Sequence, residues 1–243
     1  MKLSEFLRRT LFYISVPECV CCREKLDIND FALCKSCLKK YLAHKATQAC
    51  SLCFNTYDEC VCVNETLKKG GIKRLSKCYR YVTYEKTLPS NCLIYSLKRD
   101  NRRDVLSFLA KDLSASIIYG IPNYKDLYIT NVARRGSSIV KYGFDHTAIL
   151  AKAVARELDI PYIKALRSCA KHSQKKLSHR QRSENARFKV ISPKRVESKS
   201  FLIIDDIVTT GSSMSFAASA LKNAGATVKS CAAIAIAFRD ENK

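Results

Sequence analysis

The sequence predicts an α/β protein in which a mostly parallel sheet is flanked by helices and preceded by a small cysteine-rich module. From about residue 79 onward, short apolar stretches alternate with stretches whose apolar residues recur at helical spacing, a pattern typical of a parallel sheet. The cysteines gather earlier, nine of the 13 lying between Cys19 and Cys62. A chain of 243 residues is long enough for one α/β core and a smaller unit. We therefore expect a cysteine-rich module at 1–68 and the α/β domain at 75–243.

The same alternation assigns the elements of the α/β domain in order. Strands are expected at residues 79–84, 127–132, 201–204 and within 228–238, and helical stretches at 93–97, 104–118, 147–158 and 213–223. Residues 201–204 are all apolar, which favours a strand buried on both faces. Gly225 follows the last helix at the position where a left-handed conformation commonly ends helices.

The chain is strongly basic, with 43 Lys and Arg against 22 Asp and Glu and a formal net charge of +21. Residues 164–199 concentrate this charge and contain only two acidic residues, Glu184 and Glu197. Such a stretch is either a solvated basic loop or a patch that meets phosphates, whether of a small ligand or of a nucleic acid. Its motif-like residues, described below, favour phosphate contact.

Hydrophobic segments that could direct the chain to secretion or anchor it in a membrane are short. No apolar run approaches the roughly 18 residues of a membrane helix, so no membrane span is expected. Near the N-terminus, basic residues precede LFYISV, but Pro17 interrupts this run before it reaches the length of a secretory signal, about 7–15 residues with a small-residue cleavage site. We expect a cytoplasmic protein.

The cysteine spacing predicts structural zinc. Three CxxC pairs and one CxC pair occur within a short stretch, and each pair can present two thiolates to one metal ion. A disulfide framework fits less well without a secretory signal and with an odd number of cysteines, and redox CxxC motifs seldom occur in series. The candidate ligands are Cys19, Cys22, Cys34, Cys37, Cys50, Cys53, Cys60 and Cys62. Sequential and interleaved pairings, and one zinc ion or two, remain open. On sequence alone, metal removal should unfold the module and leave the sheet intact.

The stretch FLIIDDIVTTGSS points to a phosphate-bearing ligand. We expect Asp205 and Asp206 just after an apolar strand, where ligands bind parallel sheets. The next residues, Thr209, Thr210, Gly211, Ser212 and Ser213, lead into a helix and offer backbone N–H groups and hydroxyls to a phosphate. The carboxylates would accept hydrogen bonds from two vicinal hydroxyls of a sugar, and without ligand they should repel each other.

Other motifs with adjacent acidic residues do not match this stretch. A Walker loop would need a lysine after its second glycine, and an aspartyl phosphatase would need DxDxT. A plain helix cap explains the Thr and Ser residues but not two aspartates.

DDIVTTGSS closely resembles the phosphoribosyl-diphosphate motif of type I phosphoribosyltransferases. More narrowly, nearly the whole chain resembles the ComF family of competence-associated, phosphoribosyltransferase-like proteins. The residues that carry the resemblance are the VPECVCC stretch, Leu97-Lys98, and the spaced set Gln174, Leu177, Arg182 and Asn185. The resemblance implies a type I phosphoribosyltransferase-like fold and phosphoribosyl diphosphate, bound with magnesium, as the ligand.

By position in this family, residues 132–136 form the loop that grips pyrophosphate. Arg134 and Arg135 keep the positive charge there, while the family's two prolines and a later arginine are replaced. This departure favours ligand binding over turnover. Asp205, Asp206, Arg134 and Arg135 are the candidate catalytic residues, and the basic residues Lys175, Lys176, Arg180 and Arg182 would close over the ligand. Lys98 either reaches the same phosphates or lies along a helix surface. His146 is either an acid–base group or, more commonly for a lone histidine beside a helix start, a structural residue.

Three functions follow from the resemblance and the charge. The first is a natural-transformation protein that binds phosphoribosyl diphosphate and, through its basic face, single-stranded DNA, with other DNA-uptake proteins as partners. The second is an active phosphoribosyltransferase with an unidentified acceptor. The third is a regulator that senses the ligand. The cysteine module and the net charge favour the first.

Overall fold

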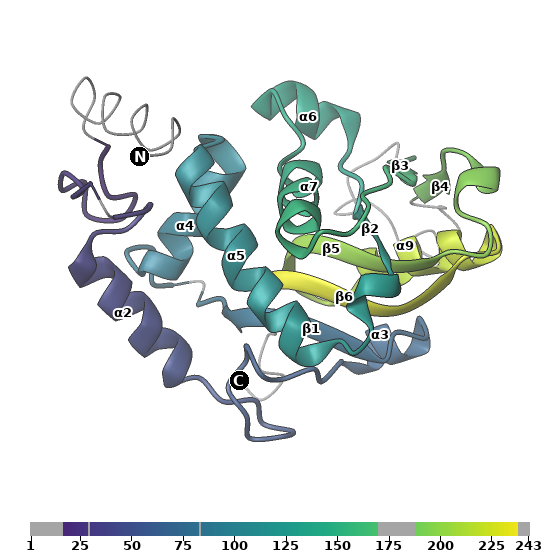
Figure 1. Cartoon of the computed structure of the whole chain (residues 1–243), viewed down its shortest axis with the longest axis horizontal. Helices are drawn as coiled ribbons and strands as arrows, with labels where there is room; N and C mark the ends of the chain where they lie inside the picture. The colour runs from purple at the N-terminus through teal and green to yellow at the C-terminus, as the bar shows by residue number, and fades with distance from the viewer. Residues whose placement is uncertain (1–16, 29, 83, 170–187, 238–243) are drawn as a thin grey trace.

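The computed structural model of the chain describes residues 17–28, 30–82, 84–169 and 188–237 (Figure 1). The strands are β1 (Arg74–Arg80), β2 (Tyr128–Asn131), β3 (Leu166–Ser168), β4 (Phe188–Val190), β5 (Ser200–Val208) and β6 (Thr227–Ile236). The helices are α2 (Lys35–Ala46), α3 (Glu65–Lys69), α4 (Pro89–Arg99), α5 (Arg103–Gly120), α6 (Gly136–Tyr142), α7 (His146–Leu158) and α9 (Ser212–Asn223), with short 3-10 turns at Tyr124–Asp126 and Pro193–Arg195.

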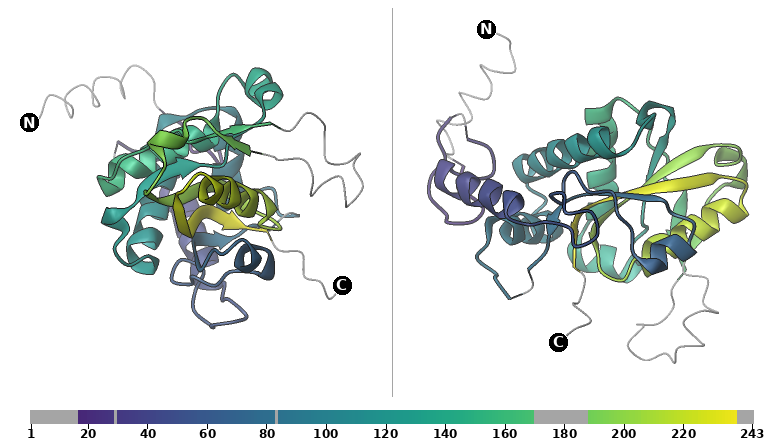
Figure 2. Two further views of the ribbon diagram at one scale, coloured as in Figure 1. Left: turned by 90° about the vertical axis from the view of Figure 1, so that its right-hand side faces the viewer. Right: turned by 90° about the horizontal axis from the view of Figure 1, so that it is seen from below.

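Four of the strands form one sheet in the order β1-β6-β5-β2, and every pair in it is parallel. β3 and β4 form a separate antiparallel pair. The predicted α/β class, a parallel sheet flanked by helices, is therefore confirmed. Parallel strands need helical crossovers that cover the sheet, and Figure 2 shows α5 and α7 on one face with α3 and α9 on the other.

Each face of the sheet carries its own hydrophobic core. Along β5, Leu202 and Ile204 pack toward α5 and α7, while Phe201 and Ile203 pack toward α9. All four side chains are at most 1% exposed. Burial on both faces is why this stretch contains no polar residue, as the apolar run predicted.

The cysteine-rich segment wraps around the edge strand β1. Cys19, Cys34 and Cys37 belong to the core on one face of the sheet, whereas Cys50 and Cys60 belong to the core on the other. The backbone N–H of Leu75 on β1 donates to the carbonyl of Val61 at 3.1 Å. The free edge of β1 is thus covered by the chain that precedes it, which protects it from pairing with other molecules.

A buried polar group also ties α2 to the sheet domain. The ring of Tyr41 packs edge-on against Tyr79 and Phe108, with centroid separations of 5.7 and 5.3 Å. The Tyr41 hydroxyl donates to Asp112 on α5, and Lys45 Nζ lies 2.7 Å from the other Asp112 oxygen. The division into 1–68 and 75–243 remains a proposal, and the packing joins the described parts of both in shared cores.

Three predicted helices are confirmed within two residues at their ends: 104–118 within α5, 147–158 within α7 and 213–223 within α9. Gly225 follows the C-cap of α9 with φ of +82°, as predicted. The strand predicted at 79–84 is misplaced, because β1 spans Arg74–Arg80 and pairs with β6 over that range. The separate β3–β4 pair and helices α2, α3 and α6 were not predicted.

The expectation that Asp205 and Asp206 follow the strand is wrong. β5 continues to Val208, because Asp205, Ile207 and Val208 stay in register with β6. Pairing with a neighbouring strand thus outweighs the low strand preference of aspartate. In the part of the chain that the structure describes, no helix is both long and apolar enough to cross a membrane.

Candidate functional site

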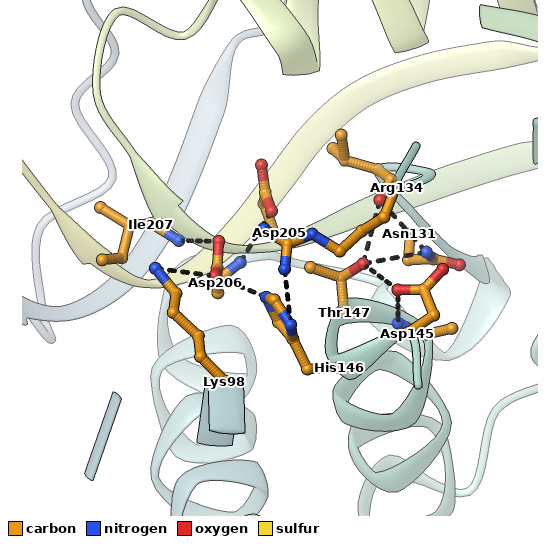
Figure 3. Close-up of polar contacts among 11 residues, drawn as sticks. Lys98, Asn131, Arg134, Asp145, His146, Thr147, Asp205, Asp206 and Ile207 are labelled. Atoms are coloured by element: carbon orange, nitrogen blue, oxygen red, sulfur yellow. Dashed lines mark hydrogen bonds and ion pairs between the residues drawn. The ribbon is translucent and has the colours of Figure 1, made fainter. Parts of the chain in front are cut away.

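The two aspartates of β5 have different surroundings (Figure 3). Asp206 is 6% exposed, and one of its oxygens, Oδ2, lies 3.1 Å from Lys98 Nζ and 2.8 Å from His146 Nε2. Lys98 reaches it from the last turn of α4 and His146 from the first turn of α7. Asp205 is half-buried and lines a small pocket on the other side of the strand.

His146 connects Asp206 to the loop that follows β2. Its ring is fully buried, and Arg134 Nη1 lies 2.7 Å from Nδ1. A guanidinium group can only donate, so Nδ1 accepts this bond. The hydrogen on Nε2 is then donated to Asp206. Arg134, His146, Asp206 and Lys98 thus form one chain of contacts, and the structural reading of His146 fits this geometry better than an exposed acid–base role.

The start of α7 holds this histidine in place. Asp145 is the N-cap residue, accepting a hydrogen bond from the N–H of Ala148 at 3.1 Å, an arrangement that stabilises helix N-termini. The Thr147 hydroxyl donates to the carbonyl of Val132 at 3.0 Å. The first turn of α7 is therefore fixed to the end of β2, and Asn131 adds a hydrogen bond to the Thr147 hydroxyl at 3.2 Å.

The pKa values of the two aspartates move in opposite directions. Burial and the charge of Asp206 raise the pKa of Asp205 well above its usual value. Burial would also raise the pKa of Asp206, but the hydrogen bond from His146 and the charge of Lys98 outweigh it and hold that pKa well below its usual value. The charge of Asp206 thus still disfavours ionisation of Asp205, as the expected repulsion between the two carboxylates implies. The charge of Asp206 itself is stabilised within the chain by Lys98 and His146.

The loop after β5 shapes the pocket that Asp205 lines. Its volume is about 30 Å³, and it is formed by Asp205 and residues 207–214. The loop leads into α9, a helix of 12 residues that begins at Ser212. Gly211 is the N-cap with φ of +79°, a conformation that favours glycine. Thr209, Thr210, Ser212 and Ser213 flank this glycine, so hydroxyls and the positive end of a helix face the same small space.

Helix α3, which follows the last cysteine of the cysteine-rich segment, packs against this loop. Asn64 Nδ2 donates to the carbonyl of Thr210 at 3.1 Å. A side chain at Gly211 would bring its Cβ to 2.8 Å from Leu67 Cγ, so the loop and α3 are in direct contact. Sequence reasoning missed Asn64, because nothing in its local pattern, a helix N-cap, indicates a partner 146 residues away.

The structure brings most of the predicted site residues to one end of the sheet. Arg134, Lys98 and Asp206 meet through the contacts above, and Asp205 shares its pocket with the Thr209–Ser213 segment. Arg135 is half-buried and immediately precedes α6. Gln174, Leu177, Arg182 and Asn185, together with Lys175, Lys176 and Arg180, lie outside the described residues.

The eight candidate metal ligands form two groups in the sequential order. Cys19, Cys22, Cys34 and Cys37 make one cluster, and Cys50, Cys53, Cys60 and Cys62 make the other. Within each, all sulfur atoms lie within 4.8 Å of one another, close to the roughly 3.8 Å separation that Zn–S bonds of about 2.3 Å impose. All 13 cysteines of the chain are free, so the disulfide alternative does not describe this structure.

The thiol pKa values show why each cluster fits a cation. Burial would raise the pKa of Cys19 and Cys50, yet backbone N–H groups of their knuckles lower both to about 7. Burial, together with neighbouring cluster cysteines, raises the pKa of Cys37 and Cys62 to about 12. One thiolate forms readily in each group, and four together require a positive ion among them. The donor set therefore fits a metal ion, and four cysteines would leave it no open position for a substrate.

A lysine lies beside the second cluster. Lys77 on β1 is 1% exposed, and its Nζ lies 3.1 Å from Cys60 Sγ and 2.9 Å from the Cys60 carbonyl. Lys77 Nζ also donates to the carbonyl of Cys62 at 3.3 Å. An ammonium group at this distance would offset part of the negative charge of a four-thiolate site.

Comparison with known proteins points to the same part of the chain. Residues 146–242 match the family model described as the phosphoribosyl transferase domain, a stretch that includes α7, β5, the loop after it, α9 and β6. It is less than half of the chain. No curated protein matches the sequence significantly.

Several solved phosphoribosyltransferases are similar in structure at low identity. Adenine phosphoribosyltransferase from Saccharomyces cerevisiae is 16% identical over 56% of this chain and 71% of its own, with a TM-score of 0.39. The glutamine phosphoribosylpyrophosphate amidotransferase of B. subtilis is 20% identical over 56% of this chain and 29% of its own, with a TM-score of 0.38. A hypoxanthine phosphoribosyltransferase from Staphylococcus aureus is 16% identical over 53% of this chain and 61% of its own, with a TM-score of 0.35. These TM-scores are too low to support an inference about this chain.

Proposed function

We propose that the chain binds phosphoribosyl diphosphate, with magnesium, beyond the carboxyl ends of β5 and β2. The observation that carries this proposal is the pocket that Asp205 shares with the Thr209–Ser213 segment at the start of α9. A carboxylate that accepts from sugar hydroxyls and a helix N-terminus that binds phosphate are the two parts a ribose 5-phosphate requires. The family match over residues 146–242 supports the same ligand.

Each residue has a distinct part in this proposal. The backbone N–H groups and hydroxyls of residues 209–213 hold the 5-phosphate, and Asp205 accepts from a ribose hydroxyl. Asp206 holds Lys98 and His146 in place, and through His146 it orients Arg134 toward the diphosphate. Arg135 adds positive charge on the same loop. Bound magnesium would neutralise the diphosphate as a leaving group.

We further propose that the two cysteine clusters each hold a structural zinc ion and that the protein is cytoplasmic, where thiols stay reduced. The wider function we propose is that of a ComF-type protein in natural transformation, acting on single-stranded DNA together with other DNA-uptake proteins. The net charge of +21 supports a polyanionic partner. An active phosphoribosyltransferase with an unidentified acceptor is the alternative, and a ligand-sensing regulator is the third.

The test is calorimetric titration of the full chain with magnesium phosphoribosyl diphosphate. Asp205→Asn should weaken binding at least tenfold, which is about 1.4 kcal/mol. Asp126→Asn, which removes an exposed carboxylate on the Tyr124–Asp126 turn, is the matched control and should bind normally. Equal affinities for the wild type and Asp205→Asn would refute the proposed site.

A pyrophosphate-release assay over a panel of nucleobases and amines then separates binding from turnover. Release of pyrophosphate with one of these acceptors would favour an active phosphoribosyltransferase over the transformation protein. Binding without release, together with salt-sensitive binding of single-stranded DNA, would support the transformation protein.

A further inference from the structure

A short segment of chain joins the second cysteine cluster to the proposed phosphate loop. Cys60 and Cys62 belong to the cluster, Asn64 follows two residues later, and α3 begins at Glu65. At the start of this segment the chain is held against β1, where the carbonyl of Val61 accepts from Leu75 N–H at 3.1 Å. This segment therefore begins at the cluster and leads into α3, the helix that contacts the loop.

The oxygen and the nitrogen of the Asn64 side-chain amide both make hydrogen bonds. Its oxygen accepts from the N–H of Leu67 at 3.0 Å and so caps α3. Its nitrogen donates to the carbonyl of Thr210 at 3.1 Å. Because the two bonds have opposite polarity, the amide has one favourable orientation, and the position of α3 and that of the loop depend on each other.

Close packing reinforces this link. Leu67 is fully buried and lies against Gly211, where an added Cβ would approach its Cγ to 2.8 Å. At the other end of α3, a Cβ on Gly70 would come within 2.3 Å of the Ser215 hydroxyl oxygen. Lys222 Nζ on α9 donates to the Gly70 carbonyl at 2.7 Å. A shift of α3 would therefore displace both the loop and α9.

We propose that Asn64 is a positioning residue through which metal held by Cys50, Cys53, Cys60 and Cys62 sets the shape of the phosphate loop. Metal fixes Cys60 and Cys62, these fix the start of α3, and Asn64 transmits that position to the Thr210 carbonyl. The first cluster lies on the other face of the sheet and is not part of this link. The consequence for ligand affinity rests on the proposed function, whereas the link itself does not.

Hydrogen exchange of the full chain tests the link without any ligand. Cys62→Ser, which disables the second cluster, should raise deuterium uptake in residues 208–215 about fivefold or more in rate, at the lower end of typical site-to-site coupling. Cys22→Ser disables the first cluster in the same way and should leave that peptide unchanged. Unchanged uptake in Cys62→Ser would overturn the proposal.

Asn64→Asp separates the link from the fold of α3. Aspartate keeps the cap on α3 but cannot donate to the Thr210 carbonyl. Loop uptake should rise in this variant while zinc content, measured by mass spectrometry, stays equal to that of the wild type. If the loop of Asn64→Asp exchanges as slowly as in the wild type, Asn64 does not transmit the position of α3.

The ligand arm measures the zinc affinity of the full chain at equilibrium, by competition with a chromogenic chelator. Binding free energies are reciprocal, so phosphoribosyl diphosphate should raise the affinity for one zinc ion in the wild type and have no such effect in Asn64→Asp. No binding of phosphoribosyl diphosphate by the wild type would refute the proposed function, and the exchange result would still decide the link. Binding that raises the zinc affinity equally in both proteins would overturn the role of Asn64.

Discussion

Lys98 and Asp206 form an ion pair across the site, with Lys98 Nζ 3.1 Å from Asp206 Oδ2. The same oxygen accepts from His146, so Asp206 is engaged by two groups from two helices. Asp205, its neighbour on β5, instead lines the pocket with the loop that follows the strand. Two adjacent carboxylates thus have separate surroundings, one engaged by Lys98 and His146 and one facing the pocket.

Separate substitutions of the two aspartates should differ in their effect on stability. Asp205→Asn should leave the free energy of unfolding equal or higher, because it removes a carboxyl group whose charged form burial disfavours. Asp206→Asn should lower it by about 1–3 kcal/mol, since Lys98 and His146 lose a charged acceptor. Urea unfolding measures both. Equal losses in the two variants would contradict this division.

The opposite pKa shifts predict opposite pH dependences. The pKa of Asp206 is lower in the folded protein than its unfolded value of about 3.9, so its contribution is fully present above about pH 4 and is lost as pH falls further. The pKa of Asp205 is raised, so ionisation of Asp205 costs stability as pH rises from about 4 through its folded pKa.

These signs are measured as differences between wild type and variant across pH. The stability advantage of the wild type over Asp206→Asn should shrink below about pH 4. Asp205→Asn should gain stability relative to the wild type as pH rises above that value. Parallel curves for all three proteins would show that neither carboxyl group titrates differently in the folded chain.

Metal removal should destabilise the whole chain. We expect two zinc ions per chain by mass spectrometry, because each four-cysteine group is closed by itself. The sequence alone led us to expect that chelation would spare the sheet. Cys19 and Tyr41 pack in the same core as Tyr79 and Leu109, so a chelator should instead lower the midpoint of one cooperative transition.

Differential scanning calorimetry with and without chelator tests this. A metal-free protein whose sheet melts at the unchanged temperature would show that the cysteine-rich segment unfolds independently. A chain with disulfides and no bound metal would refute the zinc assignment.

Binding of single-stranded DNA should depend steeply on salt if the basic stretch contacts phosphates. Replacing Lys175, Lys176 and Arg180 with Ala should reduce the log–log salt slope by up to about 2, because each lost contact removes about 0.7. The control replaces Lys69, Lys73 and Lys229, three exposed lysines of the described chain, and removes the same charge. Equal slopes in the two triple variants would move the DNA site away from residues 164–199.

Sequence periodicity was sufficient for helices such as α5 and α7, because their buried faces repeat within a few residues, but it missed α2, α3 and α6. It predicted too short a strand for β5. The polar residues Asp205 and Asp206 interrupt the apolar run, but pairing with β6 extends the strand to Val208. The aspartates and the Thr-Thr-Gly loop of the candidate site could be predicted because they lie together in the sequence.

The contacts that organise the site could not be predicted in this way. Asn64 meets Thr210, and Lys98 meets Asp206, only because the chain folds back across the sheet. Cysteine spacing indicated metal ligands but left their grouping open, since sequential and interleaved pairs have the same local pattern. The fold decides it by placing the two groups on opposite faces of the sheet.

The strand order also determines when the molecule can be completed during synthesis. β1 is the first strand of the sheet along the chain, yet its partner is β6, the last one described. Such distant pairing is slow, because a long loop must close before its contacts form. On the ribosome the cysteine-rich segment emerges before the later strands of the sheet, while one edge of β1 stays open until β6 has been made. The nascent chain therefore passes through a period in which an unpaired strand edge is exposed to self-association.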